Sequence, residues 1–177
     1  MKKALSALAV ISAVASTPLY AQQGISVTVG DGKHAQMTSV GLTWNWDKKW
    51  FTQGNWQLGA YLEGNLAYWK GDGPGKEQDI YSIGFTPVFR YEPKALSAYT
   101  PFVEGGIGAH LFSDKRLHDE KKLGTSYQFG SHVGLGFRFG DKGKYDLSYR
   151  YQHFSNAGTG GDNGGVNLNQ VRLKVGF

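Results

Sequence analysis

The sequence predicts an all-β protein, an eight-stranded antiparallel transmembrane β-barrel, and three observations support this fold class. Apolar and polar residues alternate with a period of two along most of the chain after residue 21, which is the pattern of strands with two different faces. The 177 residues include 26 glycines and 14% aromatic residues, a composition typical of barrels. The chain has no cysteine, so an exported domain of this kind must gain its stability without disulfides, for example by closing a barrel.

The start of the chain has the features of a secretory signal peptide. Two lysines near the start precede an apolar run from Ala4 to Val14, and the small residue Ala21 precedes the expected cleavage site. The run is too short to span a bilayer as a helix. We therefore expect residues 1–21 to be removed on export and residues 22–177 to form the barrel domain.

Eight segments show the alternation of barrel strands. They are residues 25–30, 37–46, 55–70, 78–91, 98–112, 126–139, 145–155 and 166–177. The third is the clearest, with Leu58, Leu62 and Leu66 on one face and Glu63 on the other. The first is short, and Pro87 interrupts the fourth at a position that suits an edge strand or a bulge.

The connections distinguish the two ends of the barrel. With an even number of strands both termini lie at one end, which outer-membrane barrels place in the periplasm and join with short turns. The 113–124 and 156–165 connections then lie at the opposite, outer end, where both are long and polar. We expect the charged 113–124 segment to be solvated. The alternation alone also fits a soluble lipocalin-like barrel, which would turn its apolar face inward.

A histidine and a serine stand two residues apart near the outer end of the seventh strand. Because side chains alternate along a strand, His153 and Ser155 share a face with Tyr149 and Tyr151, the face expected to contact lipid. Asn167 has the same parity at the outer start of the eighth strand. Polar side chains are costly there unless they are functional or lie at headgroup level. A serine beside a proton-accepting histidine suits acyl transfer, but by itself the triplet also fits two polar residues at the membrane interface.

The wider context of these residues resembles one family. The run His-Phe-Ser-Asn-Ala-Gly at 153–158, a polar loop, and Gly-Val-Asn at 165–167 are similar to the lipid A 3-O-deacylase (PagL) family. Segments 42–48, 87–89 and 101–108 are similar to it as well. The resemblance implies an eight-stranded barrel of the bacterial outer membrane, with its active site facing the outer leaflet. It also implies an esterase that hydrolyses the ester-linked 3-O-acyl chain of lipid A in lipopolysaccharide.

The resemblance implies a role for each residue of the site. Ser155 is the nucleophile and His153 is the general base. The side-chain amide of Asn156 and the backbone N–H of Gly158 hold the oxyanion, and donors of this kind are worth about 3–4 kcal/mol each in comparable sites.

The third catalytic position departs from the family. There the family can have a glutamate, fourteen residues after the histidine, and this sequence has Asn167. An asparagine can orient the imidazole of His153, but it cannot offset the charge of the imidazolium. Asp162, in the preceding loop, is the second candidate for the orienting residue.

The remaining residues give no sign of a metal or an organic cofactor. The net charge of +5 becomes +3 without the two lysines of the signal segment, which is too mild to argue for nucleic acid. The glycine-rich loop 159–165 lacks the lysine of a phosphate loop. Glu63 and Glu104 are expected inside the barrel. Four further histidines lack metal-ligand spacing and are expected on the surface or in the barrel. They are His34, His110, His118 and His132.

Two other functions stay open from the sequence alone. One is a non-enzymatic outer-membrane barrel of the adhesin or structural type, and the other is a lipid acyltransferase that uses an acceptor other than water. The oligomeric state is open too, with a homodimer as one candidate.

Overall fold

The structure, a computed structural model, describes residues 23–71, 78–118, 121–160 and 164–177. The expected signal segment, residues 1–21, lies outside the described residues. In the described part, no helix is long and apolar enough to cross a membrane. The elements found there are β1 (Gly24–Gly32), β2 (Ala35–Asn45), β3 (Trp56–Gly71), β4 (Asp79–Pro93), β5 (Tyr99–Phe112), β6 (Arg116–His118), β7 (Lys121–Lys122), β8 (Tyr127–Phe139), the 3-10 turn η1 (Asp141–Gly143), β9 (Tyr145–Ser155) and β10 (Val166–Gly176).

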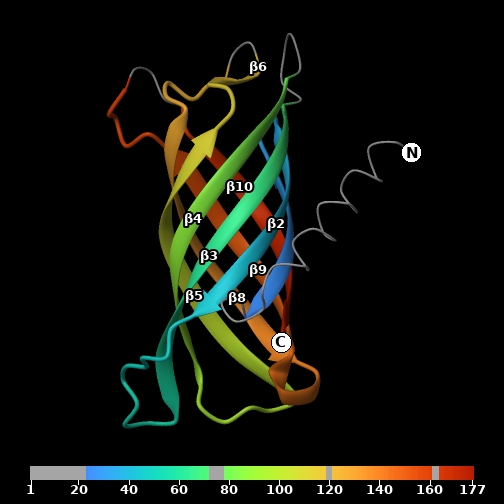
Figure 1. Cartoon of the computed structure of the whole chain (residues 1–177), viewed down its shortest axis with the longest axis vertical. Coiled ribbons are helices and arrows are strands. Elements are labelled where there is room, and N and C mark those ends of the chain that lie inside the picture. Colours follow the sequence, from blue (N-terminus) through green and yellow to red (C-terminus); the bar gives the residue numbers. More distant parts are fainter. Residues whose placement is uncertain (1–22, 72–77, 119–120, 161–163) are drawn as a thin grey trace, which may run out of the picture.

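Eight of these strands close into a barrel (Figure 1). Around it the order is β1-β10-β9-β8-β5-β4-β3-β2, and each neighbouring pair is antiparallel. β1 and β10 complete the closure, with Gly24 opposite Gly176 and Asp31 opposite Asn169. The predicted eight-stranded antiparallel barrel is confirmed. β1 has nine residues, three more than predicted, so it pairs along most of β10.

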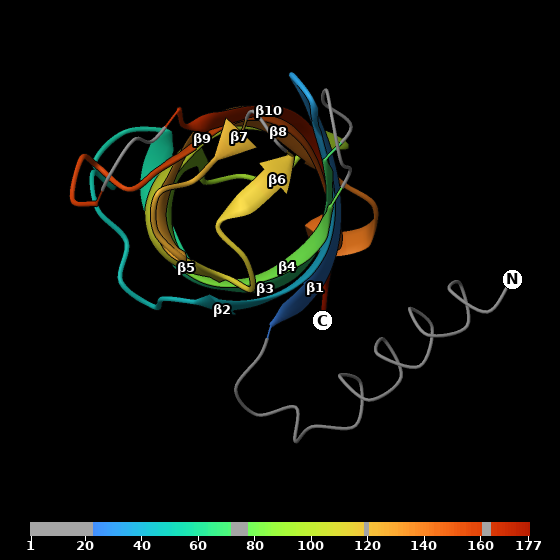
Figure 2. The ribbon, with the colours of Figure 1, turned by 90° about the horizontal axis from the view of Figure 1, so that it is seen from above.

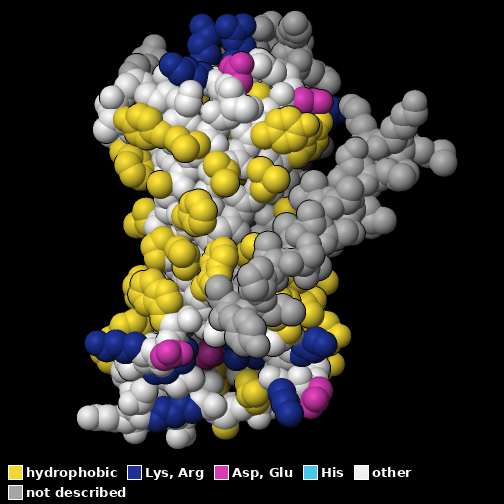
Figure 3. Space-filling model, viewed as in Figure 1, with side chains coloured by type: hydrophobic (Ala, Val, Ile, Leu, Met, Phe, Trp, Pro, Cys, Tyr) yellow, Lys and Arg dark blue, Asp and Glu magenta, His cyan; other side chains and the backbone are white. Residues whose placement is uncertain are grey.

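Apolar side chains point outward along the strands. The exposed large residues of this outer face include Val27, Val29, Ile83, Phe85, Val103, Ile107, Val133, Leu135, Val171 and Leu173. Figure 3 shows a band of hydrophobic side chains between two ends that carry charged ones. A soluble barrel would bury its apolar face, so the lipocalin-like alternative is wrong. The outer face is that of a membrane-spanning barrel.

The half of the interior nearer the termini is filled by ion pairs. The guanidinium of Arg150 lies 3.0 Å from Glu63 and 2.8 Å from Glu104. Arg90 lies 2.8 Å from Glu104 and 2.7 Å from Asp146. All five side chains are buried, and buried charges are stable only when they are paired in this way. The predicted interior position of Glu63 and Glu104 is confirmed.

The other half of the interior is apolar. Its buried cluster consists of Ala35, Met37, Ala67, Trp69, Ile80, Phe112, Leu117, Leu123, Phe154, Val166 and Leu168. Leu117 and Leu123 are fully buried and come from the 113–124 connection, which we expected to be a solvated loop. That expectation is wrong. The segment forms the β6–β7 hairpin, which lies across the mouth of the barrel (Figure 2), because its two leucines close the apolar core.

Pro87 interrupts one ladder without ending the strand. β4 and β5 pair Phe85 with Ala109 and then Val88 with Gly106, and the two positions of β4 between these pairs have no partner in the ladder. Proline has no N–H to donate, so the gap follows from its chemistry. The register is the same on both sides of the gap, and the barrel stays closed.

Candidate active site

His153 and Asn167 form a hydrogen-bonded pair on the outside of the barrel. They lie directly opposite each other on β9 and β10, near the end of the barrel covered by the β6–β7 hairpin. Nδ1 of His153 lies 2.6 Å from Oδ1 of Asn167. Fourteen residues separate the two along the chain, and the antiparallel pairing of β9 with β10 brings them together.

This hydrogen bond determines which nitrogen of His153 can act as a base. Oδ1 of Asn167 is an acceptor, so Nδ1 of His153 must carry the proton that it donates. The neutral imidazole then has its lone pair on Nε2, which is the nitrogen that a proton-accepting histidine uses in serine hydrolases. Asn167 therefore sets the tautomer of His153 without adding a charge.

Ser155 is the last residue of β9 and lies on the same face as His153. Two residues along a strand span about 7 Å, so the imidazole and the hydroxyl are neighbours on the outer face. Both side chains are partly exposed. The side chains that alternate with them, Gln152 and Phe154, are buried inside the barrel. The predicted common face of His153, Ser155 and Asn167 is thus present in the structure.

A tight turn follows Ser155 and contains both expected oxyanion donors. Asn156 is fully buried; its Nδ2 donates to the carbonyl of Gly160 at 2.6 Å, and its Oδ1 accepts the N–H of Gly158 at 2.9 Å. Ala157 and Gly158 have positive φ angles of 53° and 75°, which close the turn. In this structure the two donors therefore bond within the turn, and their oxyanion role stays a prediction. Asp162, the second candidate for orienting His153, lies outside the described residues.

The structure adds a residue that the sequence reasoning missed. Ser131 of β8 lies directly opposite His153 of β9, so Asn167, His153 and Ser131 form one row across three strands. The signal was available in the sequence, because Ser131 is a polar residue in the apolar register of Phe129 and Val133. Like His153, it is a polar residue at a strand position that the alternation pattern assigns to the apolar, outward-facing side.

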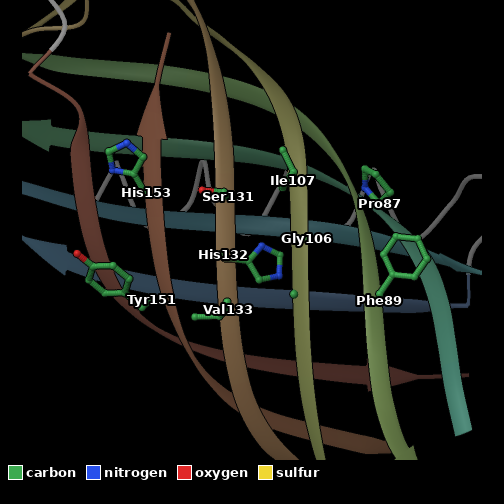
Figure 4. A pocket seen from close by; sticks show the side chains of 10 residues that line it. Pro87, Phe89, Gly106, Ile107, Ser131, His132, Val133, Tyr151 and His153 are labelled. Atoms are coloured by element: carbon green, nitrogen blue, oxygen red, sulfur yellow. The ribbon is translucent and has the colours of Figure 1, made fainter. Parts of the chain in front are cut away.

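An apolar groove runs along the barrel surface from this row. The part next to His153 has a volume of about 680 Å³. In Figure 4 the side chains of Tyr151 and His153 lie on one side of it, and those of Pro87 and Phe89 lie on the other. A second part of about 500 Å³ continues toward the opposite end of the barrel. The two parts share Phe89, Gly105, Val133 and Tyr151.

Gly105 forms part of the floor of this groove. A Cβ added there would meet only the backbone oxygen of His132, at 3.3 Å. The absence of a side chain at this outward position therefore deepens the groove. His153 stands at one end of an apolar channel that could hold a hydrocarbon chain against the barrel wall.

Of the other histidines, His132 borders the groove, where its backbone oxygen lies beneath Gly105. His110 and His132 are buried in the barrel interior, and His118 is buried in β6. Within the described ranges no three His, Asp or Glu side chains gather as a metal site requires.

The fold and this site define a class of protein, a membrane-spanning barrel whose candidate reactive side chains lie on its lipid-facing side. A family model described as lipid A 3-O-deacylase (PagL) matches residues 36–175. The lipid A deacylase PagL of Pseudomonas aeruginosa is 36% identical over 180 residues, which cover 99% of each chain. The lipid A deacylase PagL of Bordetella bronchiseptica is 34% identical over 159 residues, which cover 88% of this chain and 84% of the relative.

The fold agrees with a solved relative. The crystal structure of the outer membrane enzyme PagL matches with a TM-score of 0.76 at 31% identity, over 87% of this chain and 99% of that one. The chain therefore belongs to the lipid A 3-O-deacylase (PagL) family. It is an enzyme and an outer-membrane barrel, so the non-enzymatic alternative is set aside.

Proposed function

We propose that this barrel is a serine esterase that hydrolyses the ester-linked 3-O-acyl chain of lipid A at the outer leaflet. The observation that carries the proposal is the hydrogen bond from Nδ1 of His153 to Asn167, on a face that also presents Ser155. An ester in the outer leaflet would meet this face from the lipid side. The apolar groove beside His153 suits the acyl chain of such a substrate.

The reaction has two halves. In the first, Nε2 of His153 takes the proton of the Ser155 hydroxyl as Oγ attacks the ester carbon. The carbon–oxygen bond to the sugar then breaks, and His153 returns the proton to the leaving sugar oxygen. In the second, His153 takes a proton from the water that attacks the acyl-enzyme. It returns this proton to Oγ of Ser155 as the carbon–oxygen bond to the serine breaks, which releases the fatty acid and restores free Ser155 and neutral His153. No redox partner or metal enters this balance.

The tetrahedral intermediate needs hydrogen-bond donors for its oxyanion. The N–H of Gly158 donates to Oδ1 of Asn156 in the resting turn. Rotation of the Asn156 side chain would release this N–H and also the Nδ2 amide, which now donates to Gly160. One side-chain movement therefore supplies both donors, and substrate binding is the step that would favour it.

The proposal also covers the role of Asn167. It holds His153 in the tautomer that can take a proton from Ser155, but a neutral amide cannot stabilise the imidazolium that forms. We expect an active enzyme with a lower kcat than a carboxylate at this position would give.

Mass spectrometry of lipid A tests the function. The refolded protein without residues 1–21 is incubated with lipid A in detergent, and the products are analysed. Loss of one 3-O-linked hydroxyacyl chain, together with release of the free fatty acid, is the expected result. Appearance of the acyl chain on another acceptor would favour the acyltransferase alternative.

A matched pair of serine variants makes the test specific. Ser155→Ala should abolish the reaction, whereas Ser148→Ala should not, because Ser148 lies on the same strand but points into the barrel and is buried. Unchanged lipid A with correctly folded wild-type protein would refute the proposal.

A further inference from the structure

A cationic pocket lies on the hairpin that covers the barrel mouth. Its volume is about 470 Å³, and Lys115, Arg116 and Lys122 line it. All three side chains are exposed. Among the described residues that line it, Asp114 is the one carboxylate, and its Oδ1 accepts the backbone N–H of Arg116 at 3.0 Å.

The hairpin places two cations directly opposite each other. Arg116 of β6 pairs with Lys122 of β7 across the two-stranded ribbon. Both side chains line the pocket, so an anion bound there lies within reach of two cations. Lys115 joins the same pocket, and its carbonyl accepts the N–H of Leu123 at 2.7 Å.

The ribbon is anchored to the barrel. Leu117 and Leu123 are fully buried in the apolar core. Nε2 of the buried Gln128 donates to the carbonyls of Leu123 and Thr125, at 2.9 and 2.8 Å. These contacts hold the returning chain against β8, so the cationic side chains project from a fixed base.

The pocket lies on the outer side of the candidate active site. Phe129 of β8 is directly opposite Ser155, and the lining residue Ser126 is three positions further toward the outer end. Three residues of strand span about 10 Å. A hydrogen bond between Tyr127 Oη and Thr159 Oγ1 also connects this part of the chain to the turn after Ser155.

We propose that this pocket binds a phosphate group of the lipid A headgroup while the ester of the same molecule lies at Ser155. The inference rests on the proposed function, and it adds a recognition site for the substrate's headgroup. Lipid A is a phosphorylated glucosamine disaccharide, so its anionic groups lie on the polar side of its ester bonds. The cations of the pocket likewise lie on the outer, polar side of Ser155 and the apolar groove, so the pocket matches the order of phosphate, ester and acyl chain in the substrate.

Binding measured in detergent micelles tests the proposal. In the Ser155→Ala background, which prevents turnover, the protein should bind phosphorylated lipid A more tightly than the same lipid A after removal of its phosphates. The double variant Lys115→Gln/Lys122→Gln should lose about tenfold of this preference, because two exposed charge contacts are together worth about that factor. The preference should also decline with salt.

A matched control removes the same charge elsewhere. Lys142→Gln/Lys144→Gln changes two exposed lysines at the opposite end of the barrel and should leave the preference intact. An unchanged preference in the Lys115/Lys122 variant would overturn the proposal. So would an equal loss of binding to phosphatidylglycerol micelles, which would indicate a general anionic surface.

A neutral ester separates this inference from the proposed function. Wild-type protein and the Lys115→Gln/Lys122→Gln variant should hydrolyse a p-nitrophenyl fatty acid ester equally well, because that substrate has no phosphate. If the wild-type protein hydrolyses neither substrate, the proposed function fails, and the binding comparison still decides whether the pocket recognises phosphate.

Discussion

The interior of the barrel and its lipid-facing site differ in how many reactive side chains they contain and in how much room they leave. The interior holds arginines, carboxylates and two histidines in close contact, with ion pairs as short as 2.6 Å between Arg172 and Glu63. The cavity between Glu63 and His110 has only about 20 Å³, room for about one water. The outer site has His153, Asn167 and Ser155, but it lies beside a groove of about 680 Å³.

This difference separates two roles that side chains can have in a barrel of this size. Charged side chains that satisfy one another in a closed interior hold the strands together, but no substrate reaches them. In the proposed function, a few polar side chains on the outside act on an ester that the apolar groove holds beside them. We therefore propose that the interior provides stability and that the outer face carries out catalysis, and each prediction below tests one side of that proposal.

The largest effect is expected at the outer face. Ser155→Ala should lower kcat by about a thousandfold or more, because the proposed nucleophile is lost. His153→Ala should have a similar effect, and the double variant should be little worse than either single one, since the two residues act as a unit. The thermal and urea stability of the barrel should not change. Strongly additive losses would contradict a shared role.

Substitutions in the interior should lower the stability of the barrel and leave the activity of the folded protein unchanged. Glu104→Gln removes one of the two carboxylates that pair with each of the buried Arg90 and Arg150. The loss should cost about 3 kcal/mol of unfolding free energy, the lower end of the range for a broken buried pair. Urea unfolding in lipid vesicles measures it. Glu92→Gln is the matched control, because its partner Arg138 is partly exposed, and the cost there should be smaller.

The activity of the Glu104→Gln variant shows whether the interior affects stability alone. The folded fraction of the Glu104→Gln protein should keep its activity per molecule, since the Glu104 side chain is buried inside the barrel, on the interior arginines. A loss of kcat larger than the loss of folded protein would show that the interior takes part in catalysis and would break the assignment.

A smaller effect is expected from Asn167, the residue that we propose orients the base. Asn167→Ala should lower kcat about 10- to 100-fold with little change in KM, because His153 loses the acceptor that sets its tautomer. Asn167→Glu should raise kcat above the wild-type value by adding a charge next to the imidazolium.

Asn169→Ala is the control for this prediction. Asn169 lies two residues along the same outer face and accepts a hydrogen bond from Tyr149, so its loss should leave kcat unchanged. Equal kcat values for Asn167→Ala and wild type would show that Asn167 has no role in catalysis.

The smallest effect concerns the groove. Val133 lines both of its parts and is exposed, so Val133→Phe should fill the channel and raise KM for long-chain esters about tenfold, with little effect on short-chain ones. Val171→Phe places the same bulk on the outer face of β10, outside the groove lining. Similar KM values for the two variants would show that the groove does not hold the acyl chain.

Much of the fold could be predicted from the sequence because a transmembrane barrel has one dominant rule. Alternation with period two identified all eight barrel strands and placed His153, Ser155 and Asn167 on the outer face. The same rule put Glu63 and Glu104 inside. Parity is a local property, so it can be read residue by residue without any knowledge of distant contacts.

The features that were missed depend on contacts between segments far apart in the sequence. The 113–124 segment looks like a solvated loop because it is highly charged, yet its two leucines close the apolar core. The groove is built from residues of several strands, with its depth partly due to Gly105. The hydrogen bonds that engage Asn156 and Gly158 within their turn could not be inferred from their order in the chain.

Covalent labelling tests most directly whether catalysis takes place on the outer face. A phosphonate ester with a long alkyl chain reacts with an activated serine, and peptide mass spectrometry locates the adduct. We predict one adduct, on Ser155, that forms much more slowly in His153→Ala and leaves the buried Ser148 unmodified. An adduct on an inward-facing serine, or labelling of Ser155 at the same rate without His153, would contradict the assignment of catalysis to the outer face.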